Sequence, residues 1–127
     1  MKAIWDKWAA FGDMISQVEM LEYSREADVE GIKLKVCLKD GSSLRLLETI
    51  VDGALRCYSY YWLDEENRLI IGWDNAPHHR EVATHPHHKH IGDQHNVKAS
   101  AERCFEEVMS FIRDVLGEAR ESVKRKT

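Results

Sequence analysis

The sequence lacks the features of a membrane or secreted protein. No apolar segment approaches the roughly 18 residues that a membrane-spanning helix needs. The first residues also lack the charged and then apolar layout of a signal peptide. We therefore expect a cytoplasmic protein with no membrane partner. Its 127 residues suffice for a single domain with a hydrophobic core, but not for two.

Cysteine is scarce as well. The chain has three cysteines, Cys37, Cys57 and Cys104, which are odd in number, far apart and each within an apolar stretch. This spacing forms no Cys-x-x-Cys pair and no disulfide framework. The sequence therefore predicts free thiols that behave as small buried apolar side chains.

Basic charge is not in excess. Lysine and arginine number 18 against 22 acidic residues, which gives a net charge of −4 with histidine neutral. Proteins that bind duplex DNA nonspecifically usually carry a basic excess. The composition therefore excludes a large electrostatic surface for nucleic acid and leaves a local one open.

Apolar spacing predicts a helix at each end of the chain. Ile4, Trp8, Phe11 and Ile15 recur at helical spacing and predict a short N-terminal helix. Ser100 is the predicted N-cap of a second helix that runs to about Arg120. Its apolar face, which is expected to cover the sheet, comprises Phe105, Val108, Ile112 and Val115.

Between these helices, residues 18–74 are predicted to form an antiparallel meander of about four or five strands. Apolar and polar residues alternate there with a period of two. Asp-Gly pairs at Asp40-Gly41 and Asp52-Gly53 predict tight hairpin turns. Residues 75–98 hold both prolines and little periodicity, so they are predicted to be mostly loop. The expected fold is an α+β two-layer single domain over residues 1–127.

All seven histidines lie between His78 and His95, and this clustering makes the segment the predicted functional site. The first interpretation is a divalent metal site, because imidazole is the commonest nitrogen ligand. His85, His87, His88 and His90 are candidate ligands. Asp74 or Asp93 could add a carboxylate. The spacing matches none of the helical or cysteine-containing zinc signatures.

The second interpretation is metal-free cleavage of RNA. An imidazole can take the proton of a 2′-hydroxyl, and another can protonate the leaving oxygen. Lys89 is the nearest cation that could stabilise the phosphorane. Tyr58, Tyr60 and Trp62 share one strand face and, if exposed, could stack on unpaired bases.

The third interpretation involves no chemistry. Histidines of a solvated loop can hydrogen-bond to the backbone and close one end of the sheet. A related alternative is a binding module whose loop and aromatic face contact a protein partner.

Several motifs in this region resemble the TumE family. They are Tyr58-Ser59-Tyr60-Tyr61-Trp62, Trp73-Asp74-Asn75-Ala76-Pro77-His78-His79 and His85-Pro86-His87-His88-Lys89-His90-Ile91-Gly92-Asp93. The resemblance covers roughly residues 18–116. His85 stands where the family usually has an aromatic residue, and Arg80-Glu81-Val82 where it often has Pro-Glu-Leu. The resemblance implies a prokaryotic toxin whose partner is an antitoxin encoded beside it.

The leading hypothesis is a toxin that acts on RNA as a ribonuclease. Its predicted catalytic residues are Asp74, His78, His79, His87, His88, Lys89 and His90. Its predicted substrate-binding residues are Tyr58, Tyr60, Trp62, Trp73 and Asn75. We expect the five motif histidines to converge on one concave site beside the strand that ends at Trp73. A divalent metal, with His87, His88 and His90 as candidate ligands, and a homodimer remain open. The alternative is a non-enzymatic binding module or a metal-binding protein.

Overall fold

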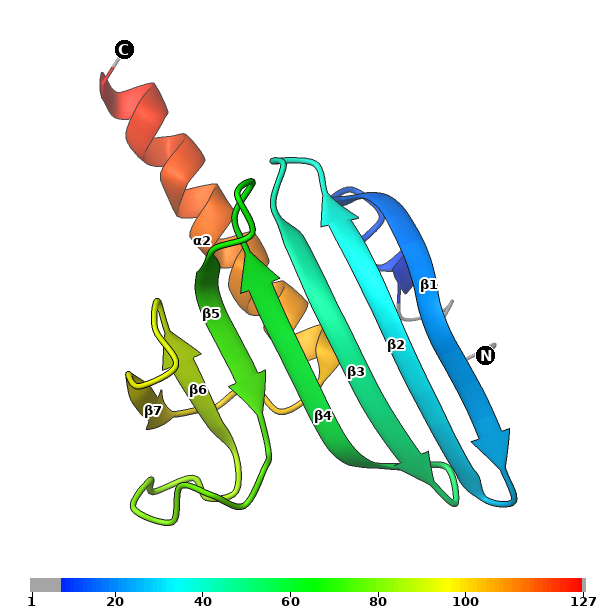
Figure 1. The fold of residues 1–127 in the computed structure, drawn as a ribbon. Helices are drawn as coiled ribbons and strands as arrows, with labels where there is room; N and C mark the ends of the chain where they lie inside the picture. The colour runs from blue at the N-terminus through cyan, green and yellow to red at the C-terminus, as the bar shows by residue number, and fades with distance from the viewer. Residues whose placement is uncertain (1–7, 127) are drawn as a thin grey trace.

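Seven strands form one antiparallel sheet in which every strand pairs with its neighbours in sequence (Figure 1). The computed structural model describes the backbone of residues 8–126 and the side chains of residues 8–118. The strands are β1 (Ile15–Glu26), β2 (Val29–Leu38), β3 (Ser43–Val51), β4 (Ala54–Leu63), β5 (Leu69–Asp74), β6 (His88–Ile91) and β7 (Val97–Ala99). Helix α2 (Phe105–Lys126) lies against one face of this sheet.

Tight turns set the meander. Both central residues of the turn between β3 and β4, Asp52 and Gly53, have positive φ angles of 52° and 78°, as a type I′ hairpin turn requires. The turn before β3 has Gly41 at a φ of 94°. The hairpins predicted from the two Asp-Gly pairs are therefore confirmed.

The hydrophobic core lies between α2 and the apolar face of the sheet. Ile32, Leu34 and Val36 alternate along β2 and are buried, as a period of two predicts. From the helix, Val108 and Ile112 are fully buried against them. The predicted amphipathic helix is confirmed, and Val115 is partly buried on the same core.

The helix begins later than the sequence indicated. Residues 100–104 are not helical, and α2 starts at Phe105 and continues to Lys126 rather than to about Arg120. The Ser100 hydroxyl donates to the Glu102 carbonyl oxygen, so Ser100 does not cap the helix. A polar residue before an apolar run resembles an N-cap in sequence, but here it shapes the preceding turn.

The sheet is larger than predicted, because residues 75–98 are mostly but not entirely loop. This segment contributes β6 and begins β7. The segment has little apolar periodicity, because the buried positions of β6 are occupied by histidine. His88 and His90 are in fact buried, at 2% and 5% exposure. The alternation in β6 is therefore one of buried imidazoles on one face of the sheet with Lys89 and Ile91 on the other.

The N-terminal helix also differs from its prediction. Ile4 lies outside the described residues, Trp8 and Ala9 are helical, residues 10–14 form turns and Ile15 already belongs to β1. Trp8 and Phe11 nevertheless join the core, with ring centroids 6.2 and 6.0 Å from that of Phe105. The apolar stripe thus predicts the burial of Trp8 and Phe11 correctly but places the C-terminal end of the helix too late in the chain.

Candidate functional site

The alternation of β6 sends its side chains to opposite faces of the sheet. Lys89 points to the helix face, where its Nζ lies 3.1 Å from Glu102 Oε1 and 5.0 Å from the centroid of the Phe111 ring. His88 and His90 therefore point to the other face, which we call the open face. Lys89, which was predicted to stabilise a phosphorane, lies on the wrong side of the sheet for that role.

Asp74 lies between the two imidazoles. In the β5–β6 register Asp74 pairs with His88. Nε2 of His88 lies 2.9 Å from one carboxylate oxygen of Asp74, and Nε2 of His90 lies 3.3 Å from the other. All three residues are buried. A buried carboxylate is costly unless positive charge or hydrogen bonds compensate it, so these three residues form one electrostatic unit.

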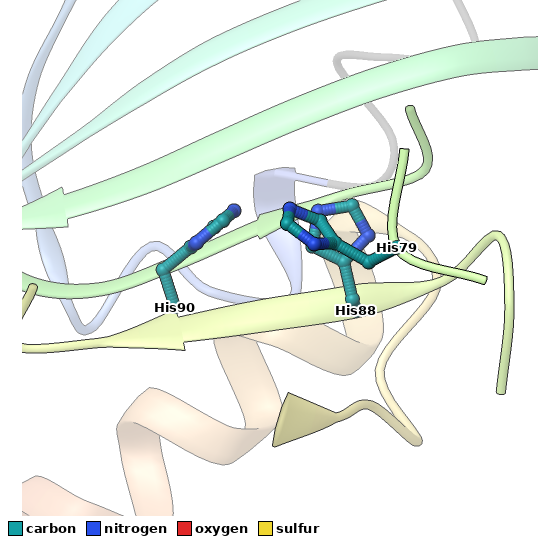
Figure 2. A group of neighbouring side chains, drawn as sticks. All are labelled: His79, His88 and His90. Carbon is teal, nitrogen blue, oxygen red and sulfur yellow. The ribbon is translucent and has the colours of Figure 1, made fainter. Parts of the chain in front are cut away.

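A third imidazole completes the group (Figure 2). The ring centroid of His79, on the loop between β5 and β6, is 4.8 Å from that of His88 and 5.8 Å from that of His90. The His79 side chain is 32% exposed. We call Asp74, His79, His88 and His90 the His–Asp cluster. Asp74, His88 and His90 are the buried part of this cluster, and solvent can reach it at His79.

Backbone carbonyls fix the tautomers of the buried imidazoles. Nδ1 of His88 lies 2.9 Å from the Pro86 carbonyl oxygen, and Nδ1 of His90 lies 2.8 Å from that of Gln94. A carbonyl oxygen can only accept, so each Nδ1 carries the hydrogen. Both Nε2 atoms are thereby directed at Asp74.

Tyr61 borders the cluster on the open face. A Cβ at Gly72 would lie 2.2 Å from Tyr61 Cδ1, so the Tyr61 ring lies directly over the Gly72 backbone. Burial, and after it the charge of Asp74, raises the pKa of Tyr61. The phenol therefore stays protonated at neutral pH and can donate a hydrogen bond at the cluster.

His87 and His78 lie outside the cluster, so the predicted convergence of five histidines is wrong for both. The His87 ring stacks on Tyr58 on the helix face, and its Nδ1 lies 2.7 Å from the Tyr58 hydroxyl. Burial, followed by the charge of Arg103, lowers the pKa of His87. The exposed His78 ring makes no hydrogen bond or ring contact in the part of the chain that the structure describes.

The predicted aromatic platform is buried. The side chains of Tyr58, Tyr60, Trp62 and Trp73 are at most 4% exposed. They face α2, so they offer no surface on which a base could stack. Trp73 Nε1 donates to Glu102 over 3.0 Å, and the Tyr60 hydroxyl donates to Glu48.

Asn75, which was also predicted to bind substrate, connects two parts of the backbone. Its side-chain oxygen accepts from the Tyr58 amide over 3.0 Å, and its Nδ2 donates to the Arg56 carbonyl oxygen over 2.8 Å. Asn75 thus holds the start of the loop that carries His79 against β4.

A row of polar residues on the open face was not predicted from the sequence. In the strand registers Lys35 pairs with Arg45, Arg45 with Tyr61, Tyr61 with Gly72 and Gly72 with His90. Side chains of paired residues lie on the same face, so this row leads across the sheet to the cluster. Arg45 Nε is buried and has no hydrogen-bond partner within the described residues. Strict alternation through β2 to β4 was the signal that could have found it.

The fold and the site define an α+β protein with a histidine–carboxylate centre on the sheet face opposite α2. The chain belongs to the toxin TumE family, whose model matches residues 6–123. No curated protein and no solved structure matches the chain. The family supports a toxin-like role and confirms the resemblance drawn from the motifs.

Within the part of the chain that the structure describes, no helix is long and apolar enough to cross a membrane.

Proposed function

We propose that this protein is the toxin of a toxin–antitoxin pair and that it cleaves RNA at the His–Asp cluster. The toxin family supplies the biological role, and RNA is the substrate by analogy with other toxins of such systems. The observation that carries the chemical part is the carboxylate of Asp74 held 2.9 and 3.3 Å from two buried imidazole nitrogens, with His79 at the exposed edge.

Cleavage within an RNA strand needs three things. The 2′-hydroxyl loses its proton and its oxygen attacks phosphorus, the 5′-oxygen leaves and takes up a proton, and the extra negative charge of the phosphorane is stabilised. The His–Asp cluster gathers groups suited to moving protons and holding charge. His79 is the one that a substrate reaches first, because its side chain is 32% exposed.

The open face provides a path for the RNA backbone. Arg45 and Lys35 stand in the row that leads to His90. Three strand spacings separate Arg45 from β6, which is about 14 Å. The two residues would therefore hold phosphates beside the cleaved bond rather than at it. Their position gives a protein of net charge −4 a local site for a polyanion.

Purified protein and a single-stranded RNA test the proposal. We expect wild-type protein to cleave the strand and His88→Ala and Asp74→Asn to lose cleavage. The matched control is His95→Ala, which removes an exposed histidine of the same segment and should cleave normally. If purified wild-type protein cleaves no RNA while its expression still arrests cells, RNA cleavage is excluded.

The exposed edge of the sheet favours a second function, binding of the antitoxin. Strand β1 is an outer strand of the sheet, and it exposes Met20, Leu21 and Tyr23 at 45%, 41% and 39%. Exposed apolar groups on an edge strand suit contact with a protein partner.

Leu21→Lys should weaken antitoxin binding and leave RNA cleavage intact, whereas His88→Ala should abolish RNA cleavage and leave antitoxin binding intact. Equal antitoxin affinity of wild type and Leu21→Lys, measured by calorimetry, would exclude this edge.

A further inference from the structure

We infer that the His–Asp cluster binds one divalent transition-metal ion of the zinc type, through His79, His88, His90 and Asp74. One ring nitrogen from each of the three histidines lies within 4.8 Å of the others. The inference concerns metal binding alone and does not depend on RNA cleavage. Of the candidate ligands drawn from the sequence, His88 and His90 are kept, and His79 takes the place of His87.

The outer nitrogens of all three imidazoles already have acceptors. Nδ1 of His88 and Nδ1 of His90 face backbone carbonyls at 2.9 and 2.8 Å. Nδ1 of His79 lies 3.3 Å from Glu81 Oε1. A histidine that binds a metal almost always donates its other ring N–H to a carbonyl, a carboxylate or water. The cluster therefore has the outer hydrogen bonds of a metal site, and its Nε2 atoms are left for the ion.

The inner nitrogens need a positive charge. With hydrogen on Nδ1, a neutral imidazole presents a lone pair at Nε2. The Nε2 atoms of His88 and His90 point at the oxygens of Asp74, and two lone pairs that face each other repel. Protons could relieve this contact, but they would place charged rings with centroids 4.9 Å apart in a buried site. Asp74 Oδ1 already accepts from the Ala76 amide over 3.0 Å, and a single cation between the carboxylate and the imidazoles satisfies the lone pairs that still face each other.

The ligand set indicates the class of ion. Three imidazole nitrogens and one carboxylate oxygen suit zinc and its first-row neighbours, whereas calcium and magnesium prefer sets made of oxygen. Ligands of a tetrahedral ion at ~2.0–2.1 Å lie about 3.4 Å apart. The ring nitrogens, which lie within 4.8 Å of one another, would therefore have to approach by up to about 1.4 Å. His79 is the member that can move, because it lies on a loop and is partly exposed.

Calorimetric titration of chelator-treated protein with zinc chloride tests the inference. We expect one ion per chain, a melting temperature that rises with zinc concentration, and visible absorption bands on a cobalt(II)-loaded sample. His88→Ala and His90→Ala should weaken zinc binding by more than the roughly 10–100-fold that loss of an outer partner costs. His79→Ala, on the partly exposed loop, should weaken binding while the far-ultraviolet circular dichroism stays that of wild type.

Two matched controls come from the same segment. His87→Ala removes the neighbouring imidazole on the helix face, and His95→Ala removes an exposed one. Both should bind zinc as wild type does. Failure of wild type to bind one ion overturns the inference, and so does unchanged binding in the folded His79→Ala variant or an equal loss in His95→Ala. Metal binding without RNA cleavage would overturn only the proposed function, and RNA cleavage by a protein that binds no metal would overturn only this inference.

Discussion

Gly72 controls the position of the Tyr61 ring. Because a Cβ at residue 72 would lie 2.2 Å from Tyr61 Cδ1, Gly72→Ala must displace the ring from the edge of the His–Asp cluster. We expect a loss of stability of about 1–3 kcal/mol, the usual cost of overpacking, measured by urea unfolding.

Two comparisons separate this contact from a general effect of removing glycine. Gly117→Ala, in α2 with nothing within 4 Å of the added Cβ, should stabilise the protein by about 0.5–1 kcal/mol. Tyr61→Ala should remove most of the penalty of Gly72→Ala in the double variant. If the two penalties simply add, the close contact between Tyr61 and Gly72 is not the cause.

The cysteines should differ in reactivity. Burial raises the pKa of Cys104 to about 12, whereas the Cys57 side chain is exposed, contrary to the burial expected of all three. Only the thiolate reacts with an alkylating agent. At pH 8.5 iodoacetamide should therefore modify Cys57 well before Cys104, as peptide mass spectrometry can show. Equal rates at both cysteines in folded protein would contradict the assignment.

Alternation explains which site residues the sequence could reveal. Once β6 is known to be a strand, His88 and His90 must share a face that excludes His87 and Lys89. The place of His79 could not be foreseen in this way, because it depends on the path of a loop without periodicity. The burial of Tyr58, Tyr60 and Trp62 likewise depends on which face α2 covers.

Among the secondary-structure elements, α2 is the one whose removal should unfold the protein. Ile112 is 0% exposed, so Ile112→Asp would bury an unpaired charge at a cost of several kcal/mol against a total stability of about 5–15 kcal/mol. We expect loss of the cooperative thermal transition followed by circular dichroism. Ser110→Asp, on the exposed side of the same helix, is the matched control. An Ile112→Asp variant that melts near the wild-type temperature would show that α2 does not support the core.

The elements in which apolar residues recur with a regular period could be predicted from the sequence, and those without such a period could not. β2 has four apolar residues at alternate positions, and α2 has an apolar stripe, so the existence and the buried face of both were predicted, although the ends of α2 were not. β6 has only four residues and β7 three. Strands this short and polar are formed by pairing, β6 with β5 and β7 with β6, rather than by their own sequence, since strand preference depends strongly on context.

For the whole molecule, buried tyrosines should limit stability at alkaline pH. Burial raises the pKa of Tyr60 and of Tyr58, with Glu48 contributing at Tyr60 and Asp74 at Tyr58. In the unfolded chain a tyrosine ionises near pH ~10. The stabilising contribution of these phenols is therefore complete below about pH 10 and is lost as the pH rises above it.

Urea unfolding between pH 8 and pH 11 measures this loss. Tyr60→Phe should show a shallower decline above pH 10, although it also loses the hydrogen bond to Glu48 and so starts from a lower stability. Tyr23→Phe, at an exposed position, is the control and should decline as wild type does. An equal slope for wild type and Tyr60→Phe would show that Tyr60 does not set the alkaline limit.

The pairing of β5 with β6 has a consequence for misfolding. Asp74 meets His88 and His90 only in the observed alignment, and a slip of one residue would turn every β6 side chain to the opposite face. The misaligned strand would present His87 and Lys89 to Asp74 and push two imidazoles toward the core. The backbone pairing that completes the sheet therefore also sets the alignment of the residues of the His–Asp cluster. A chain whose last strands are misaligned by one residue would keep the outline of the sheet but would not assemble the His–Asp cluster.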